Sequence, residues 1–380
     1  MFLVYNGKKT EEVIKSSIKE ISLKHVNGST DSNSMLIKGD NLAVMKCLLE
    51  KYDLKDRVDL VYIDPPFSTN NKFTISDGKA NTISRSLNDT IAYEDTLTDV
   101  DYIEFMRERL ILIREMMSNK GSIYYHIDYK MGHYVKVMMD EIFGKNNYMG
   151  TITRIKCNPK NFKRKSFGNI KDMILFYSKT GKHIWNEPRR PFTEEDIERL
   201  FPKINKDGRR YTTIPLHAPG ETQKGATGQP WRGMLPPKGR HWRSSPDVLE
   251  ELDKRGLIEW SKNNVPRKII YPEDRRGMLV QDVIEYKDPQ YPMYPTEKNY
   301  DLLELIVGAS SNVNSIVMDC FCGSGTTLKA AEGLGRKWIG IDESEEAIKA
   351  CFNRLGTGQL NVFSGKKNYA YFEQQVDIKE

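Results

Sequence analysis

The chain has 380 residues, of which 38% are hydrophobic and 29% charged, with a formal net charge of +6. This length allows a large core, either one domain with a sizeable insertion or two domains. No apolar run approaches the roughly 18 residues of a membrane span, and the first residues lack a signal-peptide pattern, so we expect a cytoplasmic protein with no membrane partner.

The first third of the chain alternates short apolar runs with stretches of helical periodicity. Strands are predicted at 34–38, 58–63 and 121–127, and helices at 42–49, 102–117 and 133–143. This alternation indicates a mostly parallel sheet covered on both faces. Residues 68–100, rich in Ser, Thr, Asn and Asp, are predicted to form a long loop, which in a compact domain is usually functional.

The middle of the chain differs in charge from its flanks. Residues 151–290 carry 29 Lys and Arg against 18 Asp and Glu, a net charge of +11, which leaves −5 for the rest. From about 190 to 290, prolines, glycines, arginines and tryptophans interleave around one clear helix at 246–254. This pattern predicts an inserted basic module with a polyanionic partner, the alternative being a solvated charged surface.

Strand and helix alternate again near the end of the chain. Helices are predicted at 299–307, from a glycine turn to about 334, and at 344–355, with strands at 315–318 and 338–341. The turn follows Asp319, and its glycines permit close approach of a ligand to the backbone at a helix N-terminus. Asp342 ends the next strand, where a carboxylate suits ribose hydroxyls, so a nucleoside site is predicted.

The turn lacks the G-x-G-x-x-G pattern that binds a pyrophosphate. Asp319 would repel a pyrophosphate and attract an ammonium group, which favours S-adenosylmethionine as the cofactor. The five cysteines lack the paired spacing of a zinc site, although Cys320 and Cys322 lie close together. We therefore expect reduced thiols and no metal.

A second motif, Asp64-Pro65-Pro66-Phe67, follows the predicted strand 58–63 directly. Asp64 and the Pro65 carbonyl can both accept hydrogen bonds from one planar amino group, and Phe67 offers a face for stacking. These four residues are the predicted catalytic group. A simple turn is the alternative for the motif taken alone.

Together the two motifs resemble the amino-methylating DNA methyltransferases of the circularly permuted beta group, found in restriction-modification systems, in which D-P-P-[YFW] precedes F-x-G-x-G. Gly39-Asp40 resembles the family's acid near the cofactor adenine, and residues 294–298 resemble its H-P-T-Q-K segment, with Tyr294 for His and Glu297 for Gln. The expected cofactor-binding residues are Asp40, Asp64, Thr296, Lys298, Asp319, Phe321, Cys322, Gly323, Ser324, Gly325, Thr326, Thr327 and Asp342.

The resemblance implies an α/β fold, a Rossmann-like, doubly wound, mostly parallel seven-stranded sheet, circularly permuted, with an inserted target-recognition module. Residues 1–190 and 291–365 would form the catalytic domain, 191–290 the DNA-binding insertion, and 366–380 a C-terminal tail. The strands 34–38 and 338–341 would be neighbours, so that Asp40, Asp319 and Asp342 converge.

Double-stranded DNA is the partner that this resemblance implies, and a homodimer and a cognate restriction endonuclease or subunit stay open. The expected DNA-binding residues are Lys160, Lys163, Arg164, Lys165, Arg189, Arg190, Arg209, Arg210, Trp231, Arg232, Arg240, His241, Trp242 and Arg243. For the tryptophans the alternative is a place in the core of the inserted module.

The implied reaction is direct transfer of the sulfonium methyl group to the N6 amino group of a flipped adenine. Methylation of cytosine N4 is the nearest alternative, and Asp64 favours adenine because Ser at this position is typical of the cytosine enzymes in the family. A non-catalytic DNA-binding partner with the same fold is a further alternative, disfavoured because Asp64 and the glycine turn are both intact.

Overall fold

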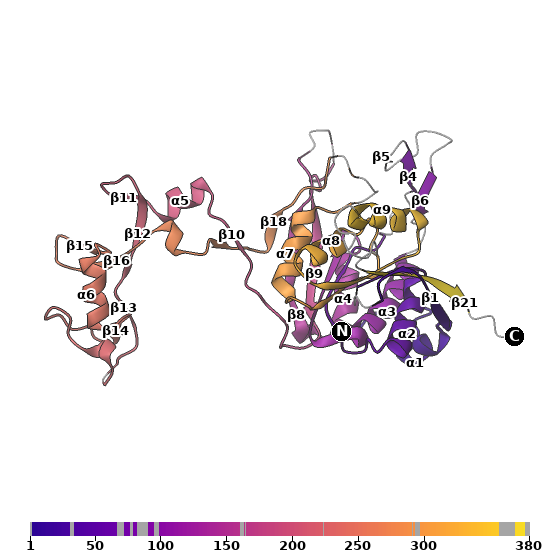
Figure 1. The fold of residues 1–380 in the computed structure, drawn as a ribbon, viewed down its shortest axis with the longest axis horizontal. Coiled ribbons are helices and arrows are strands. Elements are labelled where there is room, and N and C mark those ends of the chain that lie inside the picture. Colours follow the sequence, from indigo (N-terminus) through magenta and orange to yellow (C-terminus); the bar gives the residue numbers. More distant parts are fainter. Residues whose placement is uncertain are drawn as a thin grey trace. The chain divides into compact units, whose positions relative to one another are not determined.

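The computed structural model describes residues 2–30, 34–66, 72–76, 79–81, 90–94, 99–159, 163, 165–222, 224–290, 292, 297–356 and 369–376. The chain divides into two compact units, one of Met1–Pro188 with Gln281–Glu380 and the other of Arg189–Val280. Figure 1 shows the elements of both units. Of the helices in these ranges, none is long and apolar enough to cross a membrane.

A ten-stranded sheet organises the first unit (Figure 1). In spatial order its strands are β1 (Ile21–Gly28), β21 (Ala370–Val376), β2 (Met35–Lys38), β20 (Lys337–Asp342), β19 (Ile316–Asp319), β3 (Val58–Ile63), β7 (Met117–Ile127), β9 (Lys171–Ser178), β8 (Tyr148–Ile155) and β18 (Val283–Glu285). All neighbours from β21 to β7 run parallel, and β18 is parallel to β8, whereas β1 and β9 run antiparallel to their neighbours. The mostly parallel α/β fold is thus confirmed.

Helices cover both faces of this sheet. They are α1 (Glu11–Ser17), α2 (Asn41–Lys51), α3 (Asp99–Met116), α4 (Gly132–Phe143), α7 (Tyr300–Ser310), α8 (Thr326–Gly333) and α9 (Glu345–Gly356), with a 3₁₀ turn at Lys145–Asn147. From β2 and β3 the crossovers through α2 and α3 proceed in one direction along the sheet, whereas those through α8 and α9 proceed in the other. Because such crossovers are right-handed, the two helix groups lie on opposite faces (Figure 1), which makes the sheet doubly wound.

The predicted pairing of the two distant strands is confirmed, since β2 lies parallel to β20 with Met35 opposite Ile339. Two expectations at the sheet edges are wrong. The sheet has ten strands in place of seven, and the predicted tail 366–380 contains β21, which lies between β1 and β2. Tyr371 and Phe372 are buried there, and this burial explains why a short C-terminal segment adds to the sheet.

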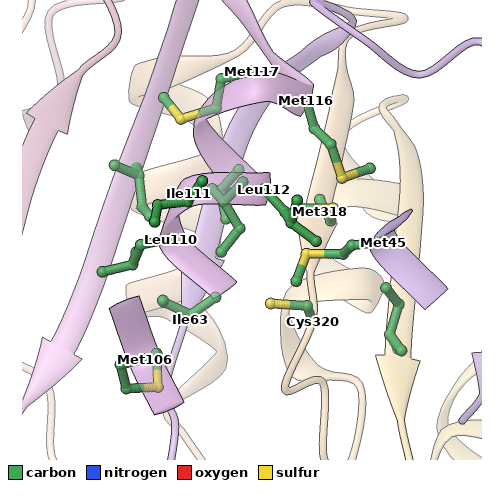
Figure 2. Packing of buried hydrophobic residues seen from close by; sticks show 14 of the residues in the cluster. Met45, Ile63, Met106, Leu110, Ile111, Leu112, Met116, Met117, Met318 and Cys320 are labelled. Carbon is green, nitrogen blue, oxygen red and sulfur yellow. The ribbon is translucent and has the colours of Figure 1, made fainter. Parts of the chain in front are cut away.

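The core of the unit lies between the sheet and α2, α3 and α4. Figure 2 shows Met45 of α2 and Leu112 of α3 in one cluster with Ile63 of β3 and Met318 of β19. Cys320, the second residue after Met318, is fully buried in the same cluster. Dense packing against α2 and α3 therefore fixes the carboxyl ends of β3 and β19.

The predicted loop 68–100 contains strands in its described parts. These are β4 (Lys72–Ser76), β5 (Lys79–Asn81) and β6 (Thr90–Glu94), which form a three-stranded antiparallel sheet. The loop prediction is wrong for these residues, because hairpin pairing supplies backbone hydrogen bonds that the polar side-chain pattern does not reveal.

The second unit is built from short elements. They are β10 (Arg189–Arg190), α5 (Glu194–Leu200), β11 (Lys203–Ile204), β12 (Arg210–Pro215), β13 (His217–Pro219), β14 (Arg240–Trp242), α6 (Pro246–Lys254), β15 (Ile258–Trp260), β16 (Pro266–Ile270) and β17 (Met278–Leu279), with 3₁₀ turns at Ala226–Gly228 and Pro272–Asp274. The main sheet of this unit has the order β11-β12-β16-β15. The second unit spans Arg189–Val280, whereas the expected insertion was 191–290. The residues after Val280 belong to the first unit, where β18 pairs with β8.

The second unit has a hydrophobic core of its own. Trp231 and Trp242, which are 2% and 4% exposed, pack in it with Leu216, Leu249 and Ile258. The Trp242 indole N–H donates to the Gln229 carbonyl at 3.0 Å. The two tryptophans therefore lie in the core of this unit, which is the alternative that the sequence left open for them.

Replacing Trp242 by Ala should destabilise this second unit by about 3–5 kcal/mol, because the change leaves a large cavity. Thermal unfolding followed by tryptophan fluorescence and circular dichroism measures the loss. Leu235→Ala is the matched control, since Leu235 is 67% exposed in the same unit and should have little effect. Equal stability of the two variants would contradict the placement of Trp242 in the core.

Candidate active site

Four neighbouring parallel strands, β2, β20, β19 and β3, end at the same edge of the sheet. An aspartate lies at or just beyond each carboxyl end: Asp40, Asp342, Asp319 and Asp64. Ligands of open α/β sheets bind at this edge, in the crevice beyond the strand ends. The topology thus gathers carboxylates that are far apart in the sequence.

A pocket opens at this edge. It is lined by Tyr62, Asp64, Glu297, Lys298, Asp319, Phe321, Cys322, Gly323, Ser324, Thr326 and Thr327. Of the expected cofactor residues, Asp40, Gly325 and Asp342 are not in this lining, and Thr296 lies outside the described residues, as does the predicted catalytic residue Phe67.

Two of the lining residues, Tyr62 and Glu297, were not among the expected site residues. Tyr62 lies two positions before Asp64 on β3, and residues i and i+2 of a strand share one face, which was the available signal. Glu297 forms an ion pair with Arg354 of α9. That pair connects the segment before α7 to α9.

The glycine turn between β19 and α8 has the geometry that the sequence predicted. Gly323 and Gly325 have φ angles of +47° and +76°, a region that favours glycine. A Cβ atom at Gly325 would also come within 2.9 Å of Cys351 Sγ. Larger residues would therefore distort the turn, which places the N-terminus of α8 at the pocket.

Asp319 is the buried carboxylate of this pocket. Its Oδ1 accepts the Phe321 N–H at 3.0 Å, and its Oδ2 accepts the Thr327 hydroxyl at 2.6 Å. Burial outweighs these hydrogen bonds and raises the pKa of Asp319 to about 7. An ammonium group bound here would restore the charged form.

Asp342 connects β20 to the glycine turn. Its Oδ2 accepts the Gly323 N–H and its Oδ1 the Ser344 N–H, each at 2.9 Å. Burial raises the pKa of Asp342 to about 6. A carboxylate offers about four lone-pair sites, so both oxygens can still accept hydroxyl groups of a ligand.

Asp40, at the carboxyl edge of the sheet, also stabilises the start of α2. It is the N-cap of α2, where its Oδ1 accepts the Ala43 N–H at 2.9 Å, and its Oδ2 lies 3.3 Å from Arg109 Nη2. Arg109 Nε also donates to Asn41 Oδ1 at 2.6 Å. These contacts fix the start of α2 at the ligand-binding edge of the sheet.

Asp64 has two carboxylate oxygens in different surroundings. Its Oδ2 forms an ion pair with Lys298 Nζ, whereas no described residue donates a hydrogen bond to the buried Oδ1. Pro65 is buried and Pro66 half-buried directly after it. A buried acceptor without a donor is costly, so Oδ1 is suited to a donor from a ligand in the pocket.

The basic residues of the second unit form two groups. In the first, guanidinium groups pair with carboxylates: Arg190 with Asp196, Arg209 with Glu273, Arg210 with Glu198, and Arg232 with Glu250 and Asp253. In the second, arginines contact neutral groups: Arg240 lies 3.2 Å from His217 Nδ1, Arg243 donates to the Pro215 carbonyl, and Arg267 donates to Thr213 Oγ1. Arg189 donates to the Gly277 carbonyl.

Three arginines of this second group gather around His217. Burial, and then the positive charges of Arg240, Arg243 and Arg267, lower the pKa of His217. His241 Nδ1 lies 2.7 Å from the Gly220 carbonyl. His217 and Arg267 were not among the expected DNA-binding residues. The pairing of β13 with β14 and of β12 with β16 brings them close to Arg240 and Arg243, and the sequence does not reveal this pairing.

Of the basic residues expected in the first unit, Lys163 and Lys165 are exposed, and Lys160 and Arg164 lie outside the described residues.

Comparisons with known proteins identify the family of this chain. A family model for N6 and N4 methyltransferases, described as DNA methylase, matches residues 58–353. The Type II methyltransferase M.EcaI of Enterobacter cloacae is 40% identical over 372 residues, covering 94% of this chain and 78% of the relative. The Type III restriction-modification enzyme StyLTI Mod subunit of Salmonella typhimurium is 25% identical over 366 residues, which cover 87% of this chain and about half (54%) of the relative.

Among solved structures, the M1.HpyAVI–SAM complex is 17% identical with a TM-score of 0.45, and the match covers 84% of this chain and 98% of that chain. The family match and the 40% identity over most of both chains are the findings that decide membership. This chain belongs to the DNA methylase family of N6 and N4 methyltransferases.

Proposed function

We propose that this chain transfers the methyl group of S-adenosylmethionine to the N6 amino group of an adenine flipped out of duplex DNA. The observation that carries the proposal is the buried Asp64 Oδ1, an acceptor without a described donor, at a pocket that combines the glycine turn with Asp319. The names of the relatives support a restriction-modification setting, and with it a cognate endonuclease as a partner.

The residues of the pocket fit the cofactor. Bound S-adenosylmethionine supplies an activated methyl group on a cationic sulfur. Asp319 can hold its ammonium group, and the backbone of Gly323 allows close approach. Asp342 is not part of the lining but accepts the N–H of Gly323, which is, and it can hold the ribose hydroxyls. Lys298 lies beside Asp64 at the same pocket and can attract a carboxylate.

The chain acts on the target base through position and charge. Asp64 Oδ1 accepts one amino N–H and so orients the nitrogen lone pair toward the methyl group, while Lys298 fixes Oδ2. Such a fixed acceptor stabilises the positive charge that develops on the amino nitrogen during transfer. Sequencing of modified bases in DNA from expressing cells tests the proposal, and N4-methylcytosine in place of N6-methyladenine would contradict it.

Asp64→Ala should reduce the rate of methyl transfer at least about 100-fold, because the variant cannot orient the amino group. Binding of S-adenosylmethionine, measured by calorimetry, should change little. Asp59→Asn on the same strand is the control, since Asp59 bonds to Ser118 away from the pocket lining. Wild-type turnover of Asp64→Ala would remove Asp64 from the catalytic group.

Cofactor affinity should depend on pH through Asp319. With the pKa of the free carboxyl at about 7, binding of an ammonium group favours the charged form and releases a proton. The dissociation constant should therefore rise as pH falls below about 7, by up to tenfold per pH unit, and level off above it. Asp319→Asn should bind more weakly and lose this dependence between pH 6 and 8; a wild-type constant independent of pH would contradict the assignment.

DNA binding should depend on Arg240, Arg243 and Arg267, whose side-chain contacts in the described part of the chain are to neutral groups. Arg243→Ala should lower the slope of log affinity against log salt by up to about 0.9, as for one lost phosphate contact. Arg209→Ala is the matched control and should change the slope less, because Glu273 already neutralises Arg209. Salt titrations on unmodified duplex DNA make the comparison, and equal changes in both variants would place the DNA elsewhere.

A further inference from the structure

A buried histidine lies behind the catalytic aspartate. His126 of β7 is 0% exposed, and its Nδ1 lies 2.8 Å from the Tyr62 hydroxyl oxygen and 3.8 Å from Asp64 Oδ1. Its Nε2 lies 3.3 Å from Asp172 Oδ2 on β9. The imidazole ring thus stands between two carboxylates, one of which is the catalytic group.

Asp172 is held in its charged form. Burial raises the pKa of this carboxyl, but hydrogen bonds from His126 and Lys156 outweigh burial and bring the pKa well below its ordinary value. Lys156 Nζ lies 2.6 Å from Oδ1, and Arg154 Nη1 lies 3.8 Å from Oδ2. Asp172 can therefore only accept hydrogen bonds.

This arrangement fixes the tautomer of His126. A neutral imidazole carries one N–H, and Asp172 requires a donor, so the proton belongs on Nε2. Nδ1 is then an acceptor for the Tyr62 hydroxyl, and it lies 3.8 Å from Asp64 Oδ1. Antiparallel pairing of β7 with β9 holds the ring in this position.

We propose that His126, acting through Asp64, takes up the proton that the target amino group loses on methylation. This inference rests on the proposed function. Lys298 already occupies Asp64 Oδ2, so a proton received at Oδ1 needs a second acceptor. His126 Nδ1 is a basic nitrogen whose approach by about 1 Å would bring it within hydrogen-bond distance.

The steps balance. As the amino nitrogen bonds to the methyl carbon, the carbon–sulfur bond breaks and its electron pair stays on sulfur. The cationic nitrogen then loses a proton to Asp64 Oδ1. The Tyr62 hydroxyl turns its hydrogen away from His126 Nδ1, which frees the lone pair of this nitrogen, and Asp64 passes the proton to Nδ1. The resulting imidazolium is stabilised between Asp64 and Asp172, and after the methylated base leaves, the proton returns through Asp64 to solvent.

The surroundings keep His126 ready to accept a proton. Burial lowers the pKa of His126 below the ordinary value of about 6.5. The negative charges of Asp64 and Asp172 raise this pKa but do not outweigh burial, and the positive charge of Lys298 lowers it further. Tyr62 is the other titratable group in contact with the ring, and Lys156 and Arg154 stand behind Asp172. The histidine is therefore neutral at pH 7 and becomes protonated only in more acidic solution.

The test compares His126→Gln with His126→Ala in single-turnover methylation of unmodified genomic DNA by the full chain. Glutamine can accept from Tyr62 and donate to Asp172 but cannot take up a proton. It should restore thermal stability relative to alanine, yet transfer methyl groups about 100-fold more slowly than wild type. With S-adenosylmethionine saturating at every pH, so that the pH dependence of its binding through Asp319 does not enter, the wild-type rate should fall with acidification below pH 6.5. This limb should be missing in His126→Gln.

His133→Gln, at an exposed position on α4, is the control and should behave as wild type. A wild-type rate in His126→Gln, or a slow rate that keeps the same acidic limb, would overturn the relay and leave the proposed function intact. Absence of methylation by the wild-type chain would overturn both. The two failures are therefore distinguishable.

Tyr62→Phe provides a second measurement that does not alter His126 itself. Without the hydroxyl, neutral His126 loses the hydrogen bond that it accepts from Tyr62. Protonated His126 still has its interactions with the carboxylates of Asp64 and Asp172, so the change destabilises the neutral form more. The pKa of His126 should rise, and the acidic limb of the rate profile should move to higher pH. An unmoved limb would show that a group other than His126 titrates, which would overturn the relay.

Discussion

The four aspartates at the carboxyl edge of the sheet would repel one another if all were charged and close together. Each meets this constraint differently: Asp64 pairs with Lys298, Asp40 with an arginine of α3, and Asp342 accepts two backbone N–H groups. Asp319, the most deeply buried, has its pKa raised to about 7. The edge is thus prepared to receive positive charge, and the cofactor and the methylated amino group both bring it.

Local sequence patterns were sufficient to predict the central strands of the sheet and the glycine turn. Three strands, one ending just before Asp64 and the others at Asp319 and Asp342, are short apolar runs followed by prolines, glycines or polar residues. Each forms where the apolar run predicts it. The glycine turn is predictable for the same reason, because positions 323 and 325 have positive φ angles, which favour glycine. These features depend on neighbours in the sequence.

Features that depend on distant pairing were beyond prediction. His126 reads as one more residue of a buried strand, and only the register of β7, β9 and β8 brings Asp172 to its side and Arg154 opposite Asp172. In residues 370–376 a run of three apolar residues is followed by Glu373, Gln374 and Gln375, so no apolar pattern runs through the segment, and it becomes a strand through its pairing with β1 and β2. The tryptophans of the second unit lie in its core, because large aromatic side chains gain more from burial than from exposure.

The order of the strands along the chain also affects the protein while it is being made. β2 has β20 and β21 as its neighbours, and both are synthesised some 300 residues after it. During translation β3, β7, β9 and β8 can pair early, whereas β2 cannot pair until β20 and β21 have been synthesised. Asp40 therefore reaches the other aspartates only at a late stage, so a partly synthesised chain holds the base-binding residues without a completed cofactor site.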